Sequence, residues 1–144
     1  MPGPAKILDP DKQLVYFAGS RIQGWADGEF LTAEPMAPAF QDVVGTDGEV
    51  ARSKSNDRRW KVTLKLLQTS SSNAFLSGLL NGDLLQPNGA GVASFSWQDM
   101  QGGSFLTSTQ AWIAKWPDVS QDRTAKAREW EIHLADAIHT EGGN

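Results

Sequence analysis

The segment from Trp60 to Leu66 constrains the fold more than any other part of the chain. Its apolar positions recur at every second residue: Trp60, Val62, Leu64 and Leu66. Lysine and threonine fill the positions between them. A period of two places alternate side chains on opposite faces of a β-strand, so this segment predicts a half-buried strand with one apolar and one basic face. The same period returns between Arg128 and Leu134 and predicts a second such strand.

Turn signals divide much of the remaining chain into shorter strands. Glycine preceded by aspartate, or doubled, tolerates the positive φ that tight hairpin turns need. Three hairpins are predicted: 21–25 with 29–32 around Asp27-Gly28, 40–44 with 49–53 around Thr46-Asp47-Gly48, and 92–97 with 104–116 around Gln101-Gly102-Gly103.

One short helix is predicted at about residues 72–81. The apolar residues between Ala74 and Leu80 have the spacing of a helical stripe, and Ser71 or Ser72 can accept the first free amides. Asn81-Gly82 supplies a signal for the C-terminal end. This order of strands, one helix and further strands predicts a mainly β fold, a small antiparallel β-barrel or sandwich with one flanking helix.

The length of 144 residues fits one domain, 1–144, with an irregular proline-containing arm at 1–12 and a flexible tail at 140–144. No apolar run approaches the roughly 20 residues that span a bilayer, and the first residues lack the layout of a signal peptide. We therefore expect a soluble protein, made in the cytosol and not inserted into a membrane.

Motifs for catalysis, metals or cofactors do not emerge from the sequence. The chain has no cysteine, which removes thiol nucleophiles and thiolate metal sites. His133 and His139 lie near Glu131 and Asp136 without a ligand spacing typical of a metal site. The glycines form no phosphate-binding pattern. We expect no cofactor and a structural, self-assembling protein in place of an enzyme.

Basic residues gather between Arg52 and Lys65, where six Lys and Arg and one Asp give a net charge of +5. The total charge is -4, so the rest of the chain carries -9. A basic stretch on an acidic molecule suits head-to-tail contact between copies. Two alternatives stay open: basic side chains that simply face solvent, and nucleic-acid binding, which the acidic total disfavours.

The six tryptophans also allow two interpretations. Most alternate with polar residues, as core positions of strands do, whereas Trp25, beside a predicted turn, is expected to be exposed or interfacial. A platform of tryptophans for sugar rings would make the chain a carbohydrate-binding β-sandwich.

Several segments in order resemble the tail tube proteins of contractile-tailed bacteriophages. They are Ile22-Gln23-Gly24-Trp25-Ala26-Asp27-Gly28-Glu29-Phe30, Val44-Gly45-Thr46-Asp47-Gly48-Glu49-Val50, Ser55-Asn56-Asp57, Thr63-Leu64-Lys65-Leu66-Leu67-Gln68-Thr69-Ser70 leading to Asn73, Ala111-Trp112-Ile113, Pro117-Asp118-Val119 and Arg128-Glu129-Trp130. The pair Arg59-Trp60, and Trp116 before Pro117, depart from the family pattern and leave the shape of those loops open. The fold is shared with the tubes of type VI secretion and other contractile injection systems, which stay as alternatives.

The resemblance implies a virion protein that assembles into stacked hexameric rings, with tail sheath, tape measure and baseplate proteins as partners and DNA passing through without specific binding. It also implies that the stretch from Gly45 to Arg59 reaches a neighbouring subunit or ring. The predicted interface residues are Asp47, Gly48, Arg52, Lys54, Asn56, Asp57, Arg58, Arg59 and Trp25. An acidic channel lining would repel DNA, and the residues suggested for it are Glu129, Glu131 and Asp136.

Overall fold

The computed structural model describes residues 13–26, 29–85, 92–100, 102–121, 123–124 and 126–142. The arm predicted for residues 1–12 and the Asp27-Gly28 turn itself lie outside the described residues. The elements along the chain are β1 (Gln13–Phe17), β2 (Ser20–Arg21), β3 (Leu31–Pro35), β4 (Phe40–Val44), β5 (Val50–Lys54), β6 (Trp60–Leu67), α1 (Ser72–Leu85), β7 (Ala93–Asp99), β8 (Phe105–Lys115), β9 (Ala127–Ala135) and β10 (Ile138–Thr140).

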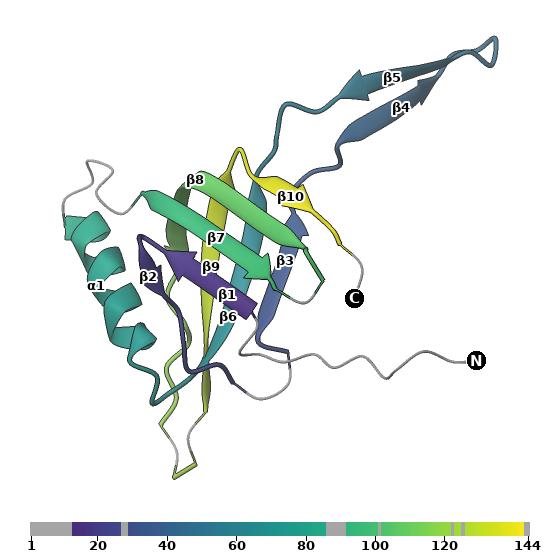
Figure 1. The fold of residues 1–144 in the computed structure, drawn as a ribbon. Helices are drawn as coiled ribbons and strands as arrows, with labels where there is room; N and C mark the ends of the chain where they lie inside the picture. The colour runs from purple at the N-terminus through teal and green to yellow at the C-terminus, as the bar shows by residue number, and fades with distance from the viewer. Residues whose placement is uncertain are drawn as a thin grey trace, which may run out of the picture.

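A curved antiparallel sheet makes up the body of the molecule (Figure 1). Its strands follow the order β2-β1-β7-β8-β9-β6-β3, and β10 pairs with the first residues of β8, beyond the part that pairs with β9. The helix α1 covers one side of this sheet, and β4 and β5 form a separate two-stranded sheet. The mainly β fold with one helix is thus confirmed. The described strands leave the large sheet open and sandwich-like, and do not close it into the barrel that was the other expectation.

The ladder between β6 and β9 carries the centre of the core. It runs from the pair Trp60 and Leu134 at one end to Leu67 and Ala127 at the other. Both predicted alternations are confirmed, because their apolar residues are buried against one cluster: Val62, Leu64, Leu66, Trp130, Ile132 and Leu134. Each aliphatic side chain buried in this way contributes roughly 1.5–3 kcal/mol to the free energy of folding. The two strands therefore supply much of the stability of the body.

The hairpin predicted around Asp27-Gly28 is wrong. The amide of Ala26 donates to the carbonyl of Lys65, and the amide of Lys65 donates to the carbonyl of Phe30. The segments on both sides of Asp27-Gly28 therefore lie along β6. The tight turn is at Ala18-Gly19, with φ of 54° and 83°, and joins β1 to β2. Pairing with a long core strand outweighed the local turn signal.

The other two hairpins are confirmed. β4 pairs with β5, and β7 pairs with β8 across a turn in which Gly103 has a φ of 76° and its amide donates to the Asp99 carbonyl at 3.0 Å. Thr140, where the tail was expected to begin, ends β10, and the Gly142 amide donates to the Ser104 hydroxyl at 2.8 Å. The flexibility of the tail stays a prediction.

The helix begins where predicted and ends later. Ser70 caps the first turn, since its hydroxyl accepts from the Ser72 amide at 3.2 Å, whereas the Ser72 hydroxyl accepts from the Gln23 amide at 3.0 Å. The predicted stop at Asn81-Gly82 is wrong, because the helix continues to Leu85. The common helix stop at asparagine or glycine uses a positive φ, which neither Asn81 nor Gly82 adopts. A glycine inside a helix costs only about 1 kcal/mol.

Candidate assembly surfaces

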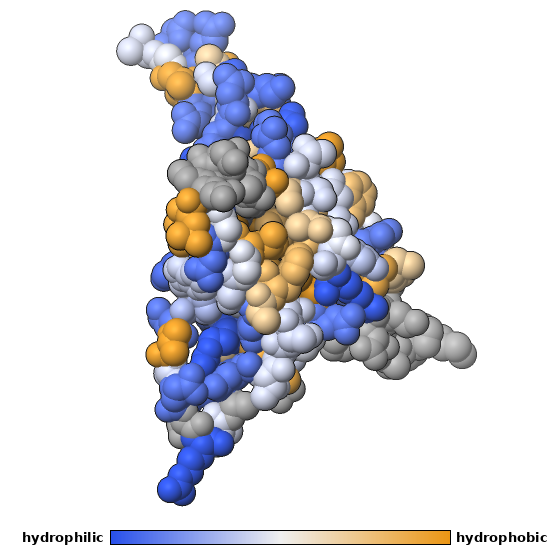
Figure 2. All heavy atoms as spheres, turned by 90° about the vertical axis from the view of Figure 1, so that its left-hand side faces the viewer, coloured by the Kyte–Doolittle hydropathy of each residue, from blue (hydrophilic) through white to orange (hydrophobic). Residues whose placement is uncertain are grey.

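The most distinctive feature of the molecule is the hairpin of β4 and β5, which projects away from the body (Figure 1). All ten residues of its two strands are exposed. Several of them are apolar, including Val43, Val44 and Val50, with 58%, 66% and 63% of their surface accessible. Hydrophobic atoms are visible among the hydrophilic ones on this projection in Figure 2. The hairpin therefore offers apolar surface at the end of a polar arm.

The turn of this hairpin is closely defined by its own hydrogen bonds. The Asp47 carboxylate accepts from the Glu49 amide at 3.0 Å, and the Gly45 amide donates to the Glu49 carbonyl at 2.7 Å. Gly48 has a φ of 83°, which side chains with a Cβ rarely adopt. The sequence therefore specifies the shape of the turn without help from the body.

Charge is divided along the hairpin. The hairpin tip, residues 43–51, contains Asp47 and Glu49 and no basic residue. Arg52 and Lys54 lie nearer the body, where the Arg52 guanidinium stacks over the Phe40 ring at 4.3 Å from its centre. The basic stretch seen in the sequence therefore begins behind an acidic and apolar tip.

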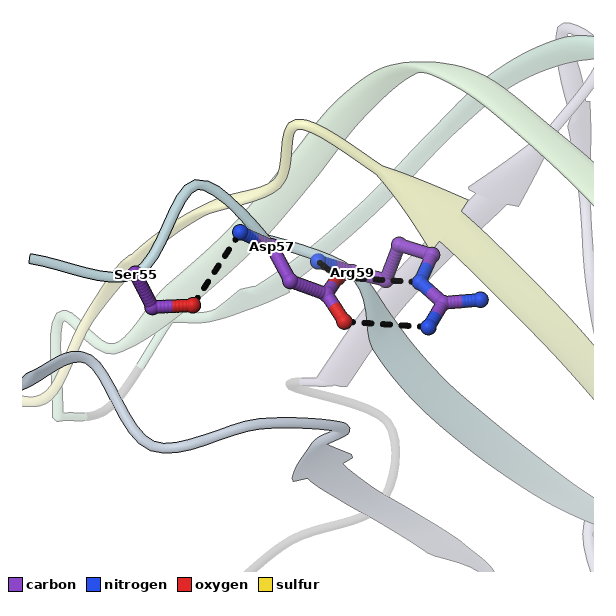
Figure 3. A network of polar contacts seen from close by, with 3 residues as sticks. All are labelled: Ser55, Asp57 and Arg59. Atoms are coloured by element: carbon purple, nitrogen blue, oxygen red, sulfur yellow. Dashed lines mark hydrogen bonds and ion pairs between the residues drawn. The ribbon is translucent and has the colours of Figure 1, made fainter. Parts of the chain in front are cut away.

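The return from the hairpin to β6 is held by the root segment, residues 55–59, shown in Figure 3. The Asp57 carboxylate accepts from the Arg59 side chain at 2.9 Å through each of its two oxygens, and also from the Arg59 amide. The Ser55 hydroxyl accepts from the Asp57 amide at 3.1 Å. The hydrogen bonds from Arg59 lower the pKa of Asp57 to about 2, and those to Asp57 raise the pKa of Arg59.

Backbone hydrogen bonds join the root segment to the body. The Met36 amide donates to the Arg59 carbonyl at 3.0 Å, and the Ala137 amide donates to the Arg58 carbonyl at 3.2 Å. Ser55 bonds through its amide to the carbonyl of Ala39, at the start of the outgoing strand. The hairpin is thus fixed at its base and exposed along its length.

Eight of the predicted interface residues lie together on the hairpin and its root: Asp47, Gly48, Arg52, Lys54, Asn56, Asp57, Arg58 and Arg59. The ninth, Trp25, lies elsewhere. It bridges to Leu66, near the far end of β6, and its ring is 5.2 Å from that of Phe30. It is half-buried against the core and does not join the hairpin group.

The acidic residues suggested for the channel lie in two places. Glu129 and Glu131 lie on the outward face of β9, where they form ion pairs with Lys65 and Lys61 at 3.6 Å. The Lys61 ammonium also contacts the Glu34 carboxylate at 3.2 Å. The hydrogen bond that Lys61 donates to Glu34, followed by the charges of Glu34 and Glu131, raises the pKa of Lys61. This outward face of β3, β6 and β9 therefore alternates in sign. Asp136 is separate, in the turn before β10 with a φ of 47°.

Sequence reasoning missed an apolar hollow at the other end of the β6–β9 ladder. We call this hollow of about 480 Å³ the end groove, and its lining residues are Gln68, Asn73, Ser77, Trp116, Pro117, Val119, Gln121, Arg128 and Trp130. The rings of Trp116 and Trp130 are 5.8 Å apart, and Val119 is 76% exposed. The unexpected tryptophan before Pro117 was the available signal for it.

The tryptophans serve mostly as packing residues. Trp130 is buried, with its indole nitrogen donating to Asn73 at 2.9 Å, and Trp116 is 40% exposed. The remaining four are half-buried: Trp25, Trp60, Trp97 and Trp112. This distribution favours core packing over a sugar-binding platform.

Neither a catalytic centre nor a metal site is apparent in the part of the chain that the structure describes. Among those residues, no three His, Asp or Glu side chains gather in a way that could hold a metal ion. The one described helix is not of a length and apolarity that would cross a membrane. The features that stand out among the described residues are the hairpin, the end groove and the charged sheet face.

Comparisons with known proteins define the class further. Residues 23–141 match the family described as Bacteriophage PhiTE tail tube protein, and this chain belongs to that family. It is a structural phage protein and not an enzyme. Structural protein ORF10 of Pseudomonas phage KPP10 is 26% identical over 123 residues, which span 85% of this chain and 71% of that protein.

Two solved structures share the fold. The cap of the anti-feeding prophage, described as its tube terminating cap, superposes with a TM-score of 0.63 at 9% identity, over 99% of this chain and 96% of the cap. The sheath/tube terminator of the extracellular contractile injection system PVC, in its extended state, gives a TM-score of 0.61 at 10% identity, over 96% and 99%. At these identities the likeness shows the fold alone.

Proposed function

We propose that this chain forms the tube of a contractile phage tail, as hexameric rings that stack around a channel through which DNA leaves the virion. It is made in the cytoplasm of the host, and its partners are the sheath around the tube, the tape measure protein inside it and the baseplate at its end. Membership of a tail tube family supports a role as a tube subunit. The projecting hairpin is the observation that most supports assembly of copies into rings and tubes.

The hairpin supports assembly because it has no core of its own. A two-stranded ribbon away from a body is only marginally stable in water, and this one exposes three valines near its turn. Exposed apolar surface on a defined projection marks a protein contact. Since the root segment fixes its direction, the hairpin of every copy points the same way, which suits regular repetition.

We propose that the outward face of β3, β6 and β9 lines the channel. Its charges alternate, with Glu34, Glu129 and Glu131 against Lys61 and Lys65. Lysines paired in this way are less available to phosphates, so DNA would pass without sticking. Asp136, beside the root segment, would contribute to the rim of a ring instead.

Negative-stain electron microscopy of the concentrated protein, with its elution volume on a sizing column, tests this proposal. Hollow tubes with six-fold rings are expected. A chain that stays monomeric at high concentration, also when baseplate proteins are supplied as nuclei, would exclude it.

The root segment gives a second test. Arg58→Glu with Arg59→Glu should block polymerisation and leave the monomer folded, because it reverses the charge of the hairpin base. Arg58→Glu alone keeps the Asp57–Arg59 pair. It therefore tests the effect of charge while the shape of the root segment is retained. Arg21→Glu, on β2, is the matched control. Normal tubes from the double variant would show that the positive charge of the hairpin base is not needed for contact between copies.

A second candidate is a terminator that closes the end of a tube. The observation that favours it is the superposition over nearly the whole chain on two proteins described as a tube terminating cap and a sheath/tube terminator. Microscopy separates the two functions, since a terminator forms single rings that bind tube ends and a tube subunit forms long stacks.

A further inference from the structure

The hairpin and the end groove lie at opposite ends of one rigid ladder. The hairpin returns into Trp60, which pairs with Leu134, whereas the groove lies toward the other end, where its lining includes Trp130, Arg128 and Gln68. At about 3.4 Å per residue, the eight paired residues make the ladder roughly 24 Å long. Figure 1 and the view turned by 90° in Figure 2 both place the hairpin at the top and the connection between β8 and β9 at the bottom.

Hydrogen bonds hold the segment after β8 that forms one wall of the end groove. Arg128 is 8% exposed, and its guanidinium donates to the Ser120 carbonyl at 3.1 Å, which holds the segment after β8 in place. The Gln68 side chain donates to that of Gln121 at 3.0 Å and is a second tie to the same segment. Trp116 and Val119 remain exposed at its mouth. The groove is therefore formed before any partner arrives.

Charge around the groove is opposite to that of the hairpin tip. Lys115 and Lys126 line the hollow adjoining the groove, which shares Trp116, Arg128 and Trp130 with it. The Glu129 and Glu131 carboxylates in that hollow form ion pairs with Lys65 and Lys61. Asp118 is the remaining acidic residue there. The hairpin tip, with Asp47 and Glu49, has the complementary sign.

We infer that the hairpin tip of one copy binds in the end groove of the next copy along the tube. Val43, Val44 and Val50 pack against Trp116 and Val119, and the acidic turn faces Lys115 and Lys126. Because donor and acceptor surfaces lie at opposite ends of the ladder, each copy presents both, and the contact repeats without closing. This inference rests on the proposed tube and names the surface that the hairpin meets.

Cysteine pairing provides the test, because the natural chain has no cysteine to interfere. Val44→Cys chains are mixed with Val119→Cys chains, assembled and mildly oxidised, and the products are separated without reductant. Each chain carries one thiol, so a disulfide between the two variants reports a contact between copies. The control mixes Val44→Cys with Ile138→Cys, which is 58% exposed on β10 at the hairpin end.

The expected product is a disulfide between residues 44 and 119, identified by mass spectrometry of the joined peptides, that is lost when assembly is prevented. Tubes that form without this product, or that join residues 44 and 138 equally well, would overturn the groove contact and leave the tube function intact. Chains that form neither rings nor tubes would overturn both.

Charge exchange tests the same contact without oxidation. Asp47→Lys with Glu49→Lys should give rings that no longer stack. Adding Lys115→Glu and Lys126→Glu to that variant should restore tubes, and either pair of changes alone should not. Tubes from the Asp47→Lys, Glu49→Lys variant, or no restoration by the fourfold variant while its rings still form, would contradict the proposed pairing.

Discussion

The two antiparallel ladders of β6 with β9 and of β4 with β5 have the same hydrogen-bonding pattern and opposite surroundings. In the first, one face of every strand is buried in the core. In the second, every residue is exposed. The hairpin is defined by its turn and its root, whereas β6 and β9 are defined by burial. Folding of the single chain therefore depends on the body, whereas in the proposed assembly the hairpin is covered by another copy.

The largest effect on the free energy of unfolding should come from the body. Leu64 is fully buried in β6, between β3 and β9. Leu64→Ala should lower the stability of the monomer by about 2–5 kcal/mol, since it removes apolar burial and leaves a cavity. Urea unfolding followed by tryptophan fluorescence measures this. Val44→Ala in the hairpin is the matched control, and equal losses from both changes would refute the contrast.

The body was also the part that the sequence predicted best. Strict alternation in β6 and β9 identified both strands, because burial of one face imposes that period on the residues themselves. The place of Trp25 and the segments around it was missed, since pairing with β6 is a long-range contact that a local turn signal does not encode. The end groove was missed for the same reason: it combines Gln68, which follows β6, with residues from α1, the β8–β9 connection and β9.

Eight of the predicted interface residues lie together because charge and turn chemistry are close in sequence there; their place at an interface stays a prediction. The residues from Asp47 to Arg59 share one projection because a hairpin keeps sequence neighbours close in space. Its division into an acidic tip and a basic base follows from the register that pairs Val44 with Val50. The suggested channel residues did not share one site, since Asp136 lies in the turn between β9 and β10, away from Glu129 and Glu131 on the face of β9.

A smaller effect on the free energy of unfolding is expected at Ser108, in β8. The Ser108 hydroxyl accepts from the Gln110 amide at 3.2 Å and donates to the carbonyl of Ala135, at the passage from β9 to β10. Ser108 is buried, so Ser108→Ala leaves polar backbone groups short of a partner and should cost about 1–3 kcal/mol. Urea unfolding checks this, with the exposed Ser94→Ala as control. A loss as small as that of the control would show that the strands do not need this hydroxyl.

Acid should change the stability of the folded chain through the root segment by less than either substitution above. The pKa of Asp57 in the folded chain, about 2, is below its ordinary value of 3.8. Its contribution to stability is therefore complete above pH 3.8 and lost as the pH falls toward 2. Carboxyl NMR titration measures the pKa, and Asp57→Asn should remove this part of the acid response. An Asp57 pKa near 3.8 would show that Arg59 does not hold the carboxylate in solution.

The smallest effect on the monomer should come from the hairpin tip, and here the contrast with the body is sharpest. Changing Val43, Val44 and Val50 together to serine should leave the urea midpoint of the monomer unchanged, because these side chains are already exposed. The same variant should not form tubes, since the apolar contact with the next copy is gone. A sizing column and microscopy test both expectations on one preparation. Tubes of normal length would show that the valines face solvent in the assembly too, and a destabilised monomer would show that the hairpin belongs to the folding unit of its own chain.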